Sequence, residues 1–202
     1  SKLRANLLTH AGRVSQVTHT LGSLWIVNCV MAVFLKRRIK SNMVNIREKN
    51  DSDNSWITNL LVNNWGGESI ITKRKVYFVQ ELKGFIAEND HQSIGLCLYN
   101  IANNECEISF LEAFQQYKGI GTALINKIFE IGIKEHLKRI WLITTNDNID
   151  ALRFYQKRNF ILKDIYRNEI AETRKIKPNI PQKGYYNIPI RDEIELEYII
   201  IS

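Results

Sequence analysis

The stretch Gln116-Tyr117-Lys118-Gly119-Ile120-Gly121 lies between an alternating apolar segment and an amphipathic helix pattern. Its two glycines let main-chain N–H groups approach a ligand with no Cβ in the way. The helix that follows adds unpaired first-turn N–H donors and the positive end of its dipole. Strand, turn and helix together predict a site for a phosphate or a diphosphate. Because such a glycine turn is also an ordinary tight connection, the pattern needs support from elsewhere in the chain.

That support comes from a second segment downstream, which runs from Thr144 to Tyr155. Together the two segments resemble the acetyl-CoA-binding core of the GNAT superfamily of N-acetyltransferases. The first matches the family's Gln/Arg-x-x-Gly-x-Gly/Ala loop at Gln116, Gly119 and Gly121. The second matches its Asn-x-x-Ala-x-x-Phe-Tyr helix at Asn148, Ala151, Phe154 and Tyr155. Two motifs in the right order are far more specific than either one, and the resemblance is sharpest from Cys106 to Phe160.

The formal net charge of +7 is concentrated at the N-terminal end of the 202 residues. Residues 1–42 hold 7 of the 28 basic residues and no acidic residue. The other 21 basic residues equal the 21 acidic residues in number, so residues 43–202 are formally neutral. A neutral domain gives no support for binding a polyanion, and we therefore expect no nucleic-acid partner.

Residues 1–42 differ in character from the rest of the chain. The apolar run Leu21–Leu35 has 15 residues and is followed by Lys36-Arg37-Arg38. It is shorter than the ~20 residues needed to cross a bilayer, and its basic cluster lies on the wrong side for a secretory signal. A membrane-surface or buried helix, an unusual extension and a non-native segment all fit this pattern. We expect an extension outside the domain of residues 43–202, and no membrane association.

Three cysteines, Cys29, Cys97 and Cys106, give an odd number without metal-ligand spacing. A disulfide framework and a metal centre are therefore not expected, and a reducing cytoplasm fits better. A homodimer is compatible with the sequence.

Apolar periodicity predicts an α+β domain, a GNAT-like mixed and twisted sheet with helices on both faces. The expected strands are Met43–Arg47, Ile70–Val79, Phe85–Glu88, Ile94–Tyr99, Cys106–Phe110, Arg139–Thr145, Phe160–Tyr166 and Ile190–Ile200. The expected helices run from Asp51–Asn54 to about Asn64, from the glycine loop onward, over Asn148–Lys157 and over Asn168–Lys175, with a loop at Pro178–Pro189.

The resemblance implies that acetyl-CoA is the acyl donor. Its diphosphate would be held by backbone N–H groups of Gln116, Tyr117, Lys118, Gly119, Ile120, Gly121 and Thr122. Asn148 would approach the pantetheine arm, although its position also suits a helix cap, and both roles can hold. The arm would pair with splayed strand edges at Cys106–Glu112 and Arg139–Thr145, and an N–H of the first strand would stabilise the oxyanion.

Tyr155 is the candidate general acid that protonates the departing thiolate, and its alternative is a half-buried core residue. Glu107, on the strand before the glycine loop, is the candidate general base that deprotonates the amine. Its alternative is an exposed charge on an edge strand. Glu112 competes for the same role with opposite strand parity, and a β-bulge would decide which of the two faces the cleft.

The acceptor side carries fewer signals. Trp65, Glu68, Tyr77 and the pair Tyr185-Tyr186 fall near segments that resemble the family's acceptor loops, although aromatic residues there are equally ordinary packing. Glu193, Glu195 and Glu197 share one strand face, which we expect to be solvated. We therefore expect an acetyl-CoA-dependent N-acetyltransferase that acts on a primary amine of a small molecule or peptide. The alternatives are a non-catalytic acyl-CoA-binding module and, less favoured, a nucleic-acid or membrane-surface binder.

Overall fold

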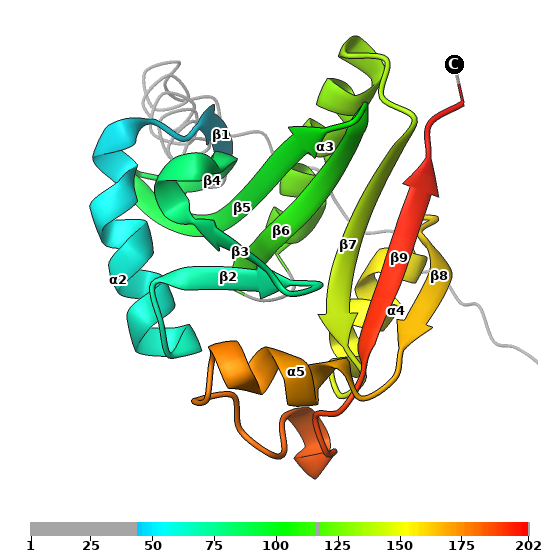
Figure 1. Cartoon of the computed structure of the whole chain (residues 1–202). Helices are drawn as coiled ribbons and strands as arrows, with labels where there is room; N and C mark the ends of the chain where they lie inside the picture. The colour runs from blue at the N-terminus through cyan, green and yellow to red at the C-terminus, as the bar shows by residue number, and fades with distance from the viewer. Residues whose placement is uncertain (1–43, 116–117, 202) are drawn as a thin grey trace, which may run out of the picture. The chain divides into compact units, whose positions relative to one another are not determined.

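A mixed sheet of seven strands forms the centre of the computed structural model, which describes residues 44–115 and 118–201 (Figure 1). Every neighbouring pair of its strands is antiparallel except β6 and β7, which are parallel. The expected extension at residues 1–42 and two loop residues, Gln116 and Tyr117, lie outside the described residues. In spatial order the strands are β1 (Asn45–Glu48), β4 (Lys83–Asn89), β5 (Gln92–Ala102), β6 (Glu105–Ala113), β7 (Arg139–Thr145), β9 (Glu193–Ile199) and β8 (Ile161–Tyr166).

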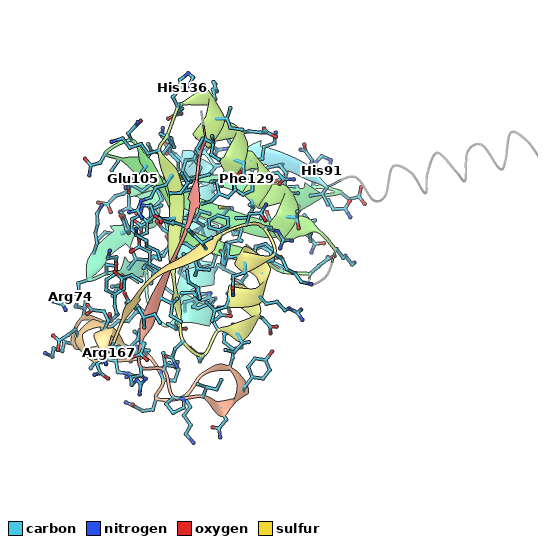
Figure 2. The ribbon with its side chains drawn as sticks, turned by 90° about the vertical axis from the view of Figure 1, so that its right-hand side faces the viewer. Arg74, His91, Glu105, Phe129, His136 and Arg167 are labelled. Atoms are coloured by element: carbon cyan, nitrogen blue, oxygen red, sulfur yellow. The ribbon has the colours of Figure 1, made fainter. Side chains whose placement is uncertain are left out.

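Helices cover both faces of this sheet. In the view of Figure 1, α3 and α4 lie behind the sheet, whereas α2 and a two-stranded hairpin lie in front of it. Phe129 of α3 and Arg74 of the hairpin turn accordingly lie on opposite sides of the sheet (Figure 2). The expected fold class is thus confirmed. The remaining elements are α2 (Asn54–Trp65), β2 (Ser69–Thr72), β3 (Lys75–Phe78), α3 (Ile120–Lys134), α4 (Ile149–Gln156), α5 (Glu169–Ile176) and short 3₁₀ turns at Asp51–Asp53, Val79–Glu81 and Tyr185–Asn187.

Strand β5 shows why the sheet needs cover on both faces. Leu96 and Leu98 pack into a core with α2, whereas Cys97 between them packs into a second core with α3. Successive side chains on a strand point to opposite faces, so a continuous apolar run such as this one must be buried twice. The apolar stripe of α3, including Leu124 and Ile128, fills the second core.

The segment expected as one strand at Ile70–Val79 is instead the hairpin of β2 and β3. Lys73 and Arg74 form its turn, with φ angles of 47° and 63°. Tight hairpin turns of this kind need positive φ at both central residues, which Asn-Gly or Asp-Gly sequences favour. Lys-Arg carries no such signal, so the reversal of the chain was not predictable from these residues.

The three glutamates of the last strand are buried, and the expectation of a solvated face is wrong. Glu193, Glu195 and Glu197 are 2%, 3% and 6% exposed. Strand β9 lies between β7 and β8, and Arg139 of β7 donates hydrogen bonds of 2.7 Å to Glu195 and 2.8 Å to Glu197. An inward-facing cation on the neighbouring strand therefore makes the burial of these two carboxylates tolerable.

Two further observations concern the cysteines and the helices. Cys97 and Cys106 are free, buried thiols, and burial raises the pKa of Cys106 to about 12. None of the helices in the described part of the chain has the length and apolar character needed to cross a bilayer.

Candidate active site

A β-bulge and a strand divergence create an opening at the centre of the sheet. In the ladder between β5 and β6, Leu98 pairs with Phe110 and Tyr99 with Ile108, so Ser109 has no partner. Strands β6 and β7 pair only from Glu105–Ile108 and Arg139–Leu142. Beyond these residues the two strands have unpaired edges that face each other. The open edges are shorter than expected, because Cys106–Ile108 and Arg139–Leu142 pair with each other.

A pocket of about 500 Å³ lies at this divergence. Both open edges line it, at Ser109–Leu111 on β6 and Ile143–Thr145 on β7. The remaining wall comes from the end of α2, from strand β2, from the start of α4 and from α5 with the loop that follows it. Since extended backbone edges pair readily with an extended ligand, the opening suits a chain that enters like an added strand.

Tyr155 of α4 lines this pocket while its ring packs in the core. The ring meets Phe154 and Phe160 edge to face, with centroids 5.1 Å and 5.4 Å away, and the residue is 7% exposed. Burial raises the pKa of Tyr155, with a small opposing contribution from Arg158. The hydroxyl is consequently protonated at neutral pH, which is the form that a general acid requires. The core role and a role in the pocket are therefore both compatible with its position.

Asn148 is the N-cap of α4, as expected. Its Oδ1 accepts a hydrogen bond of 3.1 Å from the N–H of Ala151, and Asn159 ends the following turn with a φ of 63°. Asn148 also lines the pocket, so the same residue caps the helix and forms part of the pocket wall.

The described part of the glycine loop leads directly into α3. Gly119 is the N-cap with a φ of 76°, a conformation that costs other residues roughly 1–2 kcal/mol. The N-cap glycine has no side chain to cap the first turn, and no other side chain of the described residues does so, which leaves these N–H groups open to an anion. A Cβ on Gly121 would approach the Phe154 ring to 3.1 Å, whereas one on Gly119 would meet nothing within 4 Å. Gly121 thus allows α3 to contact α4, a packing reason that the motif alone does not reveal.

Arg158 is a candidate site residue that sequence reasoning missed. Its guanidinium donates hydrogen bonds to Thr122 Oγ1, on the first turn of α3, and to the carbonyl of Phe154, and it lies 3.6 Å from the Phe154 ring centroid. Its Nε is buried without a partner, and among the described residues no carboxylate pairs with it. Burial lowers its pKa. Only its proximity in sequence to Tyr155 could have drawn attention to it.

Glu107 lies apart from this pocket. It is 4% exposed on a central strand, so the alternative of an exposed charge on an edge strand is wrong. Tyr77 donates a hydrogen bond of 2.6 Å to one carboxylate oxygen, and Thr72 donates to the other. Glu107 lines a smaller cavity of about 270 Å³, and among the described residues Thr72 lines both cavities.

The bulge also settles the relation between the two candidate bases. Glu112 lies five positions after Glu107, an odd offset that would place the two on opposite faces of a regular strand. The extra residue at Ser109 brings them to the same face. Glu112 Oε2 accepts a long hydrogen bond of 3.4 Å from Trp65 of α2.

The expected acceptor-side residues are distributed unevenly. Trp65 and Tyr185 line the large pocket, whereas Tyr77 supports Glu107 and lines only the smaller cavity. Tyr186 is 64% exposed, and its hydroxyl donates a hydrogen bond of 2.5 Å to Asp150. Glu68 is exposed and does not line either cavity.

Comparison with known proteins agrees with this architecture. The model of the acetyltransferase (GNAT) family matches residues 50–160. Protein YdhI of Bacillus subtilis is 36% identical over 159 residues, which are 78% of this chain and 99% of YdhI. Protein YxbD of the same organism is 42% identical over 133 residues, which are 65% of this chain and 84% of YxbD. The crystal structure of a B. subtilis acetyltransferase in complex with CoA has the same fold, with 16% identity, a TM-score of 0.59 and coverage of 79% and 100% of the two chains.

Proposed function

The chain belongs to the GNAT acetyltransferase family, and from this premise we propose that it is an acetyl-CoA-dependent N-acetyltransferase. It transfers an acetyl group directly to a primary amine of a small molecule or peptide. The observation that carries this proposal is the pocket at the divergence of β6 and β7, which open strand edges, Asn148 and Tyr155 line together. Such a pocket can bring together the thioester, an N–H group that donates to the oxyanion, and a general acid.

The donor end of the proposed site is the first turn of α3. Its N–H groups, together with those of Lys118 and Gly119 just before the helix, receive the diphosphate of acetyl-CoA. Arg158, which pairs with no carboxylate among the described residues, adds a cation beside Thr122 and thereby supports an anion at this position. Fold relatives carry the same kind of ligand, since the B. subtilis structure is a complex with CoA and a GNAT-family acetyltransferase of Elizabethkingia anophelis has acetyl-CoA bound.

The reacting end of the proposed site is the bulge. The pantetheine arm extends along the open edges, and an N–H of Ser109–Leu111 donates to the developing oxyanion of the thioester carbonyl. Tyr155 gives its proton to the thiolate that leaves. Removal of the proton from the amine is the remaining step, for which Glu107 stays a prediction, since it lines only the smaller cavity and contacts the wall of the large pocket at Thr72.

The alternative is an acyl-CoA-binding module without turnover. Such a module would use the first turn of α3 and the open edges, but it would have no use for a protonated tyrosine in the pocket wall. The position of Tyr155 in the pocket therefore favours the enzyme.

Two measurements on the full chain test the proposal. Calorimetric titration with CoA should give saturable binding, and acetyl-CoA should release free thiol in the presence of primary amines, with an equal amount of acetylated amine. Binding of CoA without acetylation of any amine would favour the binding module. Absence of CoA binding would contradict both functions.

A further inference from the structure

Three charged residues line the large pocket: Asp147, Lys177 and Glu193. Lys177 donates from Nζ to the carbonyl of Ser69 at 3.2 Å, so its cation is held at the start of β2. Asp147 accepts the N–H of Tyr185 at 2.9 Å and thereby holds the loop after α5 in place. Glu193 begins β9 and accepts hydrogen bonds from Thr173 of α5 and from the hairpin turn. These three groups differ in what satisfies them.

Glu193 is a buried carboxylate without a cation partner among the described residues. It is 2% exposed, and it accepts hydrogen bonds from the Thr173 hydroxyl at 3.2 Å and the Lys73 N–H at 3.3 Å. The next two glutamates of the strand differ in this respect, since Glu195 and Glu197 both pair with Arg139. Two long hydrogen bonds from neutral donors compensate a buried charge only partly. An ammonium group in the pocket would supply the missing partner.

Two further residues of the pocket wall each hold a buried polar atom that has no partner among the described residues. Ser109 is 9% exposed, and its Oγ has no hydrogen-bond partner in the described part of the chain. The same holds for Oδ1 of Asp147, which is 2% exposed. Buried polar atoms are nearly always satisfied in native proteins, so orphaned atoms around one pocket indicate a polar ligand that occupies it.

The rest of the wall is apolar. Leu61, Ile70, Phe110 and Ile170 line the pocket together with the exposed ring of Trp65. A ligand that satisfies this wall and Glu193 together has an apolar body and one positive charge.

From this arrangement, which rests on the proposed N-acetyltransferase function, we infer that Glu193 binds the ammonium group of the acceptor and acts as its general base. The acceptor class is a protonated primary amine on an apolar body. Glu107 is then a positioning residue, because it lines only the smaller cavity and its two oxygens accept short hydroxyl hydrogen bonds from the hairpin.

The proton balance of this step is complete within the pocket. Glu193 takes one proton from the ammonium, and the neutral nitrogen attacks the thioester carbonyl carbon, so that a C–N bond forms. When the C–S bond breaks, the thiolate takes a proton from Tyr155 and the nitrogen loses its second proton. That proton restores Tyr155 through solvent, and the proton on Glu193 also passes to solvent. The products are the acetamide, CoA thiol and one released proton.

The charges around Glu193 set the direction of its pH dependence. Burial raises its pKa, and Glu169 of α5 raises it further. Lys73 and the Thr173 hydroxyl lower it, and Arg74 of the same hairpin turn is also within electrostatic reach. Because the base must be ionised, kcat/KM should fall as pH falls through the pKa of Glu193.

The matched variants Glu193→Gln and Glu107→Gln test this inference on the full chain with n-hexylamine as the acceptor. We expect Glu193→Gln to lose the acid limb of kcat/KM and to lower its plateau roughly 100-fold, with the Kd of CoA unchanged within about twofold. Glu107→Gln should keep the acid limb. Thr173→Val, which removes one donor to the carboxylate, should shift that limb to higher pH. An unchanged acid limb in Glu193→Gln, or its loss in Glu107→Gln, would overturn the inference.

A binding measurement separates this inference from the proposed function. The CoA-bound wild-type protein should bind hexylammonium at least ~10-fold more tightly than 1-hexanol, and Glu193→Gln should lose this preference. If the wild-type protein shows the preference but forms no acetamide, the enzyme proposal fails while the ammonium site stands. Equal binding of the two probes by the wild-type protein would refute the ammonium site itself.

Discussion

The proposed acid step depends on a single oxygen atom of Tyr155, so this residue gives the most specific test of the mechanism. Tyr155→Phe keeps the ring that packs against Phe154 and Phe160. We expect kcat to fall roughly 100-fold, because general acid catalysis contributes about 10²–10⁴ in rate, while the Kd of CoA stays within about twofold. Steady-state kinetics and calorimetry on the same preparation check this result.

Tyr198→Phe is the matched control for that change. Tyr198 belongs to the same aromatic cluster, 4.6 Å from Phe129 between centroids, but does not line the pocket. It should leave kcat unchanged within about twofold. If both variants lose activity equally, the effect is one of packing and Tyr155 is not the acid.

Among individual residues, those of the two motifs were predictable from the sequence, whereas the residues that surround them in the pocket were not. Asn148 and Tyr155 are recognisable because their spacing on a helix is fixed by the chain itself. Glu193 faces the pocket because β9 lies beside β7 and because α5 covers it, and both conditions are long-range. The same reason explains why the burial of the three glutamates in β9 was not predicted.

At the level of elements, the proposed diphosphate site depends on the contact between α3 and the turn after α4. Arg158 of the turn after α4 reaches Thr122 on the first turn of α3. Arg158→Gln removes the cation but retains a donor. We expect the Kd of CoA to rise roughly tenfold, since one hydrogen bond to a charged group is worth about 1.5–3 kcal/mol and Arg158 is partly exposed. Calorimetric titration measures this change.

Lys157→Gln removes the adjacent positive charge, which is exposed at the end of α4. This control should change the Kd of CoA by less than about twofold at moderate salt. Equal losses in both variants would mean that Arg158 acts through net charge alone and not through its contact with α3.

The hairpin of β2 and β3 shows where element prediction failed and why this matters. Its turn residues, Lys73 and Arg74, are not residue types that signal such a turn. In the structure, Arg74 forms an ion pair with Glu169 of α5, and the Lys73 N–H donates a hydrogen bond to Glu193. A single straight strand over Ile70–Val79 would not have reached α5. The part of the pocket wall that β2 and α5 form was therefore not predictable from the sequence, whereas the glycine loop and the Asn148 helix were.

For the molecule as a whole, Asp53 connects β1 to the start of α2 and does not line the pocket. It accepts a bidentate pair from Arg47 at 2.7 and 2.8 Å and further bonds from the Asn50 N–H and Trp56 Nε1. We expect Asp53→Asn to lower the free energy of unfolding by roughly 2 kcal/mol. A broken buried pair costs more than this, but Arg47 keeps a third of its surface in water. Urea denaturation gives the value.

The pH dependence of that loss has a definite sign. The Arg47 guanidinium holds the pKa of Asp53 well below its ordinary value. Its contribution is therefore present above the unfolded pKa of ~3.9 and disappears as pH falls toward the folded pKa. The difference in unfolding free energy between wild type and Asp53→Asn should shrink below about pH 4. Asp51→Asn, an exposed control in the same turn, should show no such difference.

The fold itself was largely readable from local pattern. The apolar run of β5, the stripe of α3 and the flanking turns at Asn103–Asn104 specify their elements without long-range information. The sheet order and the divergence after Ile108 and Leu142 depend on which strands meet, and local pattern does not contain that information.

The central claim is that acetyl-CoA lies along the open edge of β6 with its diphosphate on the first turn of α3. Amide hydrogen exchange of the protein with and without CoA tests this claim most directly. We expect new protection at the N–H groups of Ser109–Leu111 and Gly119–Thr122, while the amides of β8 stay unchanged. Saturable CoA binding that leaves both segments unprotected, or that protects another part of the chain instead, would contradict the account.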